Sequence, residues 1–163
     1  MGAAARGVVV IVLSRIDNRL IHGQVIEAWV PHLRVRRLVV ADDVTANDAM
    51  AQAAMGLAVP ESVEVLHTTV EALDARALSA DAVPTLILFR DVEGAVRARA
   101  HGLPDGRLTV GNVHAGPGRA PVSRSVFLTV DEAAKLDALG ASGMDVVLQA
   151  VPSETPVRVS RAA

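Results

Sequence analysis

An uninterrupted β-branched and aliphatic run, VVVIVL at Val8–Leu13, decides the fold class of this chain. Strands that are buried on both faces, as in parallel sheets covered by helices, have such continuous apolar sequences. The polar run Ser14–Arg19 follows directly, and the apolar stretch is much shorter than the roughly 20 residues of a membrane span. We therefore predict a buried strand at Val8–Leu13 rather than a secretory signal or a transmembrane helix.

Similar short apolar runs recur along the chain and alternate with stretches of helical periodicity. The further predicted strands are Arg37–Ala41, Val63–His67, Thr85–Phe89, Leu108–Val110, Val126–Leu128 and Val146–Ala150. The predicted helices are Val25–Leu33, Ala46–Leu57, Val70–Leu78, Val92–Ala100 and Asp131–Leu139, the last with Asp131 as its N-cap. This alternation predicts an α/β fold with a parallel sheet between helices.

The length and composition suit one domain that spans residues 1–163. The chain has 163 residues, of which 51% are hydrophobic, so a sizeable core can be buried. We predict frayed ends at Met1–Arg6 and Val157–Ala163. The stretch Gly111–Arg124 contains three Gly and two Pro and is predicted to be a long loop, which in compact domains is often functional.

Charge and composition exclude several classes of function. The formal net charge is −2 and aromatic residues make up 2% of the chain, whereas nucleic-acid binders usually show a basic stripe with stacking aromatics. Cysteine is absent, which excludes disulfides and thiolate chemistry. The chain has neither a P-loop nor a dinucleotide fingerprint, and we expect no cofactor. The pair Asp42 and Asp43 is a weak metal signal that N-capping or loop solvation explains better.

The first strand-to-helix turn, RIDNRLIHG at Arg15–Gly23, is unusually polar for a chain of this composition. A neutral imidazole at His22 would be a good nucleophile, and the charges of Arg15 and Arg19 would disfavour its protonation. Arginine also binds phosphate oxygens with a planar fork, and a helix that begins near Gly23 adds N–H groups for an anion. The pattern therefore favours a phosphohistidine. A solvated turn, with Asp17 as an arginine partner, is the alternative from spacing alone.

The longer string RIDNRLIHGQV at Arg15–Val25, with Trp29 following, closely resembles the active loop of a known family. That family comprises the IIB components of the mannose/fructose/sorbose class of the bacterial phosphoenolpyruvate-dependent sugar phosphotransferase system (PTS). The segments Val39–Asp43, Gly111–His114 and Val146–Pro152 are similar to later family segments, so the resemblance covers nearly the whole chain.

The resemblance implies a three-layer α/β/α fold with a mainly parallel sheet of six to seven strands and a central first strand. It implies that His22 accepts a phosphoryl group from a phosphorylated IIA protein. His22 then passes it to a sugar held by membrane IIC and IID subunits, which makes the chain a protein-Nπ-phosphohistidine–sugar phosphotransferase. Arg15, Arg19 and Gly23 would hold the phosphate, and Asp17 would orient one of the arginines. The family also implies a cytoplasmic protein that associates with the inner membrane through the permease, and it often forms homodimers.

Two departures from the family pattern are visible. Asn18 replaces an acid that is common at its position, and the C-terminus lacks a clear closing helix. Two further regions could approach His22: His114 and Asn112 as supporting residues, and Phe89–Asp91, where an ion pair between Arg90 and Asp91 is the simpler interpretation. A regulatory phosphorelay protein, phosphorylated on the same histidine without sugar transport, is the alternative function. A passive anion-binding module is a third hypothesis. The sequence names neither the sugar nor the phosphorylated ring nitrogen.

Overall fold

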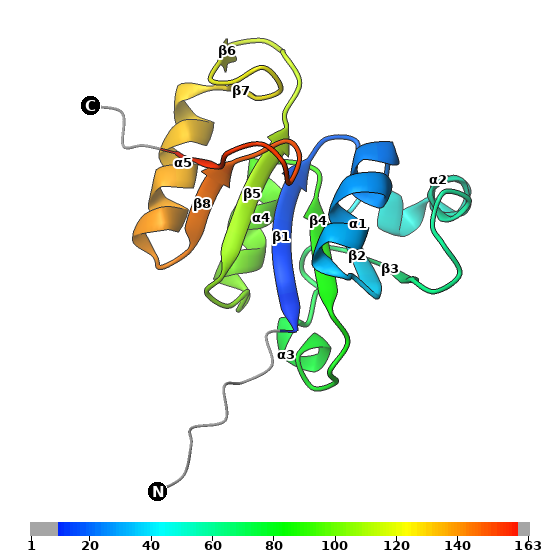
Figure 1. Cartoon of the computed structure of the whole chain (residues 1–163). Helices are drawn as coiled ribbons and strands as arrows, with labels where there is room; N and C mark the ends of the chain where they lie inside the picture. The colour runs from blue at the N-terminus through cyan, green and yellow to red at the C-terminus, as the bar shows by residue number, and fades with distance from the viewer. Residues whose placement is uncertain (1–9, 160–163) are drawn as a thin grey trace, which may run out of the picture.

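The computed structural model describes residues 10–159 and places one seven-stranded sheet between helices (Figure 1). The sheet order β3-β2-β4-β1-β5-β8-β9 puts β1 at the centre. All pairings are parallel except that of β9 with β8. The strands are β1 (Ile11–Asp17), β2 (Arg37–Ala41), β3 (Glu64–Thr68), β4 (Thr85–Phe89), β5 (Arg107–Asn112), β8 (Asp145–Leu148) and β9 (Val157–Arg158). The predicted fold class is confirmed, including the central first strand.

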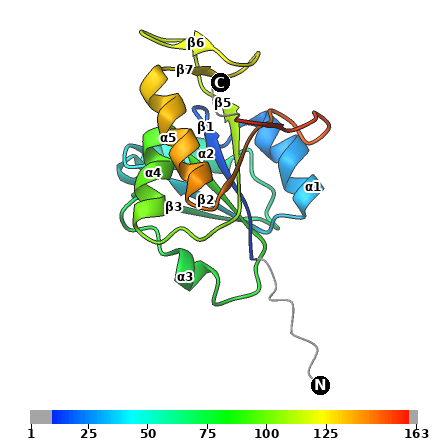
Figure 2. The same cartoon turned by 90° about the vertical axis from the view of Figure 1, so that its left-hand side faces the viewer.

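The helices form two layers, because the apolar residues of each strand point alternately to opposite faces. The helical elements are a π-helical segment (Val25–Trp29), α1 (Val30–Leu33), a 3-10 turn (Thr45–Asn47), α2 (Ala49–Gly56), α3 (Ala75–Leu78), α4 (Val92–Ala100) and α5 (Val130–Ala141). Buried side chains of the π-helical segment and α1 pack with Leu13, Leu38 and Leu86 on one face of the sheet. Those of α3, α4 and α5 pack with Ile16, Ile87 and Val110 on the other (Figure 2).

The boundaries of the first strand differ from the prediction. β2 and β4 have the predicted bounds, but β1 runs to Asp17, and the start of the predicted run, residues 8–9, lies outside the described residues. Ser14–Ile16 belong to the strand because their backbone pairs with both β4 and β5, and Asp17 extends it by pairing with Asn112 of β5. Arg15 and Asp17 are therefore residues of a buried central strand, and the first turn begins only at Asn18.

Three helices differ from their predicted ranges for local reasons. The side chain of Asp48 accepts a hydrogen bond from Ala51 N, so α2 begins at Ala49 rather than at Ala46. Asp74 caps α3 in the same way, and only the last part of the predicted Val70–Leu78 helix forms. Thr129, rather than Asp131, caps α5. Asp131 instead lies in the first turn of that helix, where a carboxylate favours the helix dipole.

The last third of the chain contains more strand than the sequence indicated. Gly111 and Asn112 belong to β5, and the predicted loop also contains β6 (Ala120–Pro121). β6 pairs with β7 (Phe127–Leu128) in a two-stranded ribbon, so the predicted strand at Val126–Leu128 is not part of the main sheet. The predicted frayed end at Val157–Ala163 is wrong for its first two residues, which form β9. Residues 160–163 of that end lie outside the described part.

β5 and β8 end at the upper edge of the sheet in Figure 1, where the β6–β7 ribbon also projects, and the strands that pair parallel with them run in the same direction. The segments that follow β1, β4, β5 and β8 therefore meet at this edge, which is where open α/β sheets bind their ligands. None of the described helices has the length and the apolar character that a membrane span requires.

Candidate functional site

A tight turn at the end of β1 brings His22 back over the strand that precedes it. Leu20 N donates to Asp17 O at 3.0 Å, and Leu20 is buried in the left-handed conformation, with a φ of 59°. A bulky residue rarely adopts this conformation, and strain of this kind is typical of functional sites. His22 O then accepts hydrogen bonds from Val25 N and Ile26 N, so the helical backbone starts directly behind the imidazole.

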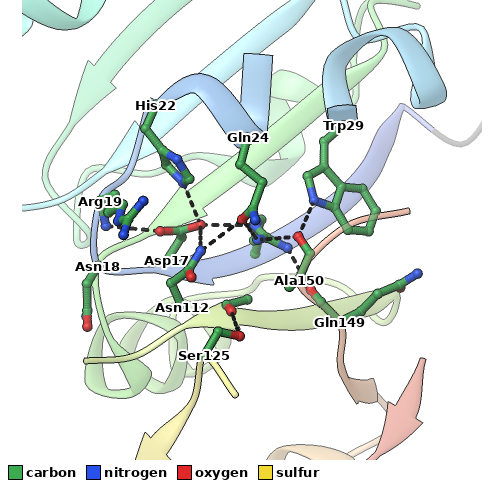
Figure 3. Close-up of polar contacts among 12 residues, drawn as sticks. Asp17, Asn18, Arg19, His22, Gln24, Trp29, Asn112, Ser125, Gln149 and Ala150 are labelled. Atoms are coloured by element: carbon green, nitrogen blue, oxygen red, sulfur yellow. Dashed lines mark hydrogen bonds and ion pairs between the residues drawn. The ribbon is translucent and has the colours of Figure 1, made fainter. Parts of the chain in front are cut away.

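The imidazole of His22 contacts the carboxylate of Asp17, which is the last residue of β1 (Figure 3). His22 Nε2 lies 2.9 Å from Asp17 Oδ2. The side chain of His22 is 15% exposed, whereas that of Asp17 is fully buried. No described residue forms a hydrogen bond with Nδ1 of His22. One ring nitrogen is thus fixed against the protein, while the ring keeps access to solvent.

Asp17 accepts hydrogen bonds from three other residues in addition to His22. Its Oδ2 accepts from Arg15 Nε at 3.2 Å and from Asn112 Nδ2 at 2.9 Å, and its Oδ1 accepts from Arg19 N at 3.0 Å. Burial alone would raise the pKa of Asp17. The hydrogen bond from His22, the charge of Arg15 and the bond from Asn112 outweigh it and lower the pKa below the ordinary value of an aspartate. Asp17 is therefore ionised and acts only as an acceptor.

Arg15 is the predicted site residue that the structure places differently. Its side chain has 0% exposed surface, and the guanidinium donates to Asp17, to Gln24 Oε1 and to two carbonyls that follow β8. The distances to those carbonyls, Gln149 O and Ala150 O, are both 2.9 Å. The ring of Trp29 covers the guanidinium, with its centroid 5.1 Å from Cζ. The prediction that Arg15 holds the phosphate does not fit this geometry, because the group is enclosed.

Gly111 explains how a guanidinium fits inside the sheet edge. A Cβ atom at this position would lie 2.0 Å from an Nη atom of Arg15, far inside van der Waals contact. The glycine therefore leaves the space that the buried arginine occupies. Ser125 Oγ donates to Gly111 O at 2.7 Å, which fastens the end of the β6–β7 ribbon to the same point.

Arg19 lies in the turn that follows β1, whereas Arg15 lies in the strand itself. Its side chain is exposed, and no described residue pairs with its guanidinium. Figure 3 draws it beside His22, with its backbone N–H fixed to Asp17. Gly23 is also exposed, and a Cβ atom added there would meet nothing within 4 Å. The ring of His22 therefore has an accessible cation and open backbone next to it.

The two supporting residues from the segment at the end of β5 have different positions. The side chain of Asn112 is part of the cluster, because it donates to both Asp17 and Gln24. His114 is exposed, and the only link of this residue to the turn is its backbone N–H, which donates to Asn18 Oδ1 at 2.6 Å among the described contacts. Asn18 Nδ2 donates to Arg90 O at 2.6 Å, so Asn18 joins the ends of three strands.

The expected ion pair between Arg90 and Asp91 does not form. Arg90 binds Asp42 with two hydrogen bonds, of 3.0 and 2.8 Å, because β2 and β4 are neighbours and end at the same level. Asp91 instead caps α4 through Gly94 N. Asp42 also accepts from Thr45 N, and Asp43 accepts from Val70 N. Neither caps the 3-10 turn that follows, because its N-cap residue is Val44. Within residues 10–159, no group of three or more acidic, histidine or cysteine residues is placed to hold a metal ion.

The sequence reasoning missed three partners of the site. Gln24 accepts from Arg15 and Asn112, and the carbonyls of Gln149 and Ala150 hold the far end of Arg15. Trp29, expected in the core, is buried, but its Nε1 also donates to Ala150 O at 2.9 Å. Gln24 stands two residues after His22 in the quoted motif, and this closeness was the available signal. The carbonyls carry no signal in the sequence, because every residue has one.

Comparisons with known proteins show the family of this chain. Residues 11–162 match the family described as the PTS system sorbose subfamily IIB component. The N-acetylgalactosamine-specific phosphotransferase enzyme IIB component 2 of Escherichia coli K12 is 32% identical over 148 residues, which are 90% of this chain and 94% of that protein.

Solved structures show the same likeness. The crystal structure of the N-acetylgalactosamine-specific IIB component 1 from Escherichia coli has a TM-score of 0.86 at 28% identity, covering 92% of this chain and 99% of that chain. The IIB domain of the sorbose permease from Klebsiella pneumoniae has a TM-score of 0.81 at 25% identity, covering 91% and 93%. The chain therefore belongs to the sorbose subfamily of PTS IIB components, which accept a phosphoryl group from IIA and transfer it to a sugar during transport.

Proposed function

We propose that Nδ1 of His22 is the atom that carries the phosphoryl group in this chain. The observation that supports it is the 2.9 Å contact between His22 Nε2 and Asp17 Oδ2. The pKa of Asp17 is lowered, so its carboxylate accepts and Nε2 must bear the hydrogen. A neutral imidazole has a single N–H, so the lone pair that can attack phosphorus is on Nδ1. The chain would then act as a protein-Nπ-phosphohistidine–sugar phosphotransferase.

The same contact serves both halves of the transfer. In the first half, the Nδ1 lone pair forms a bond to phosphorus as the bond to the donor protein breaks. With Nε2 still protonated, the phosphorylated ring is a cation, and a cationic ring is a better leaving group than a neutral one. The buried carboxylate of Asp17 stabilises that charge. In the second half, a sugar hydroxyl oxygen bonds to phosphorus as the Nδ1–P bond breaks; the bond's electron pair returns to Nδ1, the ring leaves as the neutral Nε2–H imidazole, and the hydroxyl proton passes to solvent.

Arg19 and the backbone of Gly23 would hold the phosphate oxygens. Both are exposed next to His22, and the space around Gly23 is open. Phosphoryl transfer needs charge stabilisation above all, and the guanidinium of Arg19 can supply it without breaking a bond inside the protein. Arg15 would not contact the phosphate and would instead fix the position of Asp17, to which it donates a hydrogen bond.

The partners follow from the family role. The donor would be a phosphorylated IIA protein, and the acceptor a sugar bound by membrane IIC and IID subunits. We propose a cytoplasmic location, with attachment to the inner membrane through those subunits. The predicted homodimer and the absence of nucleic-acid partners stay predictions.

The decisive experiment is phosphorylation from phosphoenolpyruvate with the general carrier proteins and a IIA protein. An acid-labile, base-stable label should appear on the wild type and be absent from His22→Ala. His101→Ala, at the end of α4, is the control and should label normally. Label on His22→Ala would move the carrier residue elsewhere. ³¹P–¹⁵N NMR of the labelled ring should show phosphorus on Nδ1.

Transfer to sugar separates transport from regulation. Membranes that contain the neighbouring-gene IIC and IID subunits should discharge the labelled protein and form sugar phosphate. A protein that labels on His22 but never discharges to any sugar would favour the regulatory phosphorelay instead.

A further inference from the structure

We propose that Gln24 is a positioning residue for His22, and that its side-chain oxygen decides which ring nitrogen carries the hydrogen. The inference rests on the proposed function for its kinetic consequence but not for its structural test. Gln24 does not touch the imidazole in any described contact. It acts through Arg15 and Asn112, which both contact Asp17.

Four side chains, of which Figure 3 labels Asp17, Gln24 and Asn112, form a closed ring of hydrogen bonds beneath His22. Gln24 Oε1 accepts from Arg15 Nη2 at 3.1 Å and from Asn112 Nδ2 at 3.0 Å. Arg15 Nε and Asn112 Nδ2 then each donate to Asp17 Oδ2, at 3.2 and 2.9 Å. Gln24 Oε1 and Asp17 Oδ2 are thus the two acceptors of the ring, and Arg15 and Asn112 are its two donors.

The ring fixes the direction of the Asn112 amide. An amide nitrogen has two hydrogens, and Asn112 places one toward Asp17 and the other toward Gln24. Gln24 Oε1 has two lone pairs, which the bonds from Arg15 and Asn112 use. If the oxygen at position 24 is removed, one donor of Arg15 and one of Asn112 are left without their acceptor in a buried site. Both groups would then move to find other partners, because an unpaired buried donor is costly.

The π-helical segment explains why Gln24 can reach this ring. Val30 N donates to Val25 O, five residues back, where an α-helix would use a residue four back. Residues five apart lie about 140° from each other around an α-helix axis. The wider π turn brings Gln24 and Trp29, which are five apart, toward the same side. Both therefore contact Arg15, Gln24 through its oxygen and Trp29 through its ring face.

Movement of Arg15 or Asn112 would release Asp17, whose Oδ2 also binds His22 Nε2. The carboxylate holds the hydrogen on Nε2 only while it stays in place, 2.9 Å from that nitrogen. With a mobile carboxylate, the imidazole populates both tautomers, and the fraction with a free Nδ1 lone pair falls. This decrease in the Nε2–H tautomer occurs in the unphosphorylated protein, before any phosphoryl group is transferred.

The test is ¹⁵N NMR of the His22 ring in the unphosphorylated protein, at an alkaline pH where imidazoles are neutral. The wild type should show the single Nε2–H tautomer. Gln24→Met removes the acceptor at similar volume, and Gln24→Asn withdraws it by one methylene, so both should show a mixture of tautomers. Gln24→Glu keeps the acceptor oxygens and should restore the single tautomer. Phosphorylation of Gln24→Met by phospho-IIA should be about tenfold slower than that of the wild type.

Gln52→Met is the matched control. Gln52 donates to Thr45 O and Ala46 O next to α2, away from the ring, so its loss should lower thermal stability without changing the tautomer. A single Nε2–H tautomer in both Gln24→Met and Gln24→Asn would overturn the proposal. The tautomer is measured without phosphorylation. Failure of the wild type to label would therefore refute the proposed function, while the tautomer measurement would still test the role of Gln24.

Discussion

The end of β1 and the turn that follows it carry similar polar residues but place them in opposite environments. Arg15, in the strand, is fully enclosed and its guanidinium bonds four acceptors, whereas Arg19, in the turn, is exposed and pairs with no described residue. Only four positions separate them. The strand is flanked by β4 and β5, while the turn lies beyond the sheet edge. The comparison teaches that residue type alone does not tell an enclosed structural cation from an exposed cation that is free to meet a ligand.

The largest effect on stability should come from substitution of the enclosed residue, Arg15. Arg15→Met leaves the carboxylate of Asp17 buried without its cation, and it removes the donor to Gln149 O, whereas Ala150 O keeps its bond from Trp29 Nε1. Loss of one partner from a buried pair costs about 3–5 kcal/mol, so we expect the free energy of unfolding to fall by that amount. Urea unfolding measures it. A loss below about 1 kcal/mol would show that Arg15 is not the anchor that its contacts suggest.

Arg19→Met is the matched substitution in the exposed half. Surface changes of this kind usually alter stability by less than about 0.5 kcal/mol. The rate of phosphorylation by phospho-IIA should nevertheless fall by about 10- to 100-fold, because a charge that stabilises the transferring group is lost. Single-turnover kinetics and urea unfolding of the same sample separate the two quantities. Equal losses of stability and rate would make Arg19 structural instead.

Gly111→Ala should reveal how tightly Arg15 is held. A Cβ atom would lie 2.0 Å from the guanidinium, which four hydrogen bonds keep in place. Overpacking of this kind costs about 1–3 kcal/mol. The cost should largely disappear in the Arg15→Met background, where the opposing group is gone. A double-mutant cycle on unfolding measures that coupling, and additive losses would mean that the two residues do not meet.

The smallest expected effect is a change in how the free energy of unfolding depends on pH. The pKa of Asp17 is lowered in the folded protein, so its stabilisation is present above the ordinary carboxyl pKa of about 4 and is lost as the pH falls through the lower folded value. Arg15→Met removes a cation and should raise the pKa of Asp17, so the loss begins at a higher pH than in the wild type. Arg19→Met should follow the wild-type profile. Urea unfolding between neutral and acidic pH tests this, and identical profiles for the two variants would contradict it.

Much of the fold could be predicted from the sequence, because strands that are buried on both faces have continuous apolar sequences. Continuous apolar runs predicted β2 and β4 with their observed bounds, and the alternation of strands and helices predicted the parallel sheet. The errors occur where backbone pairing and local polar partners outweigh the apolar pattern. β1 continues through Ser14–Asp17 because two neighbouring strands pair with it, and β9 forms because an edge of the sheet was available to Val157 and Arg158.

The sequence by itself determined the chemical groups of the site and the position of the turn that carries them. The tertiary structure decided which groups face solvent, because burial depends on neighbours that are distant along the chain. Arg15 is enclosed by the segment after β8 and by the space at Gly111, more than ninety residues away. His22 Nε2 lies against Asp17, which Arg15 and Asn112 hold in place. Hydrogen bonds of fixed geometry between four segments turn a polar sequence motif into an oriented imidazole.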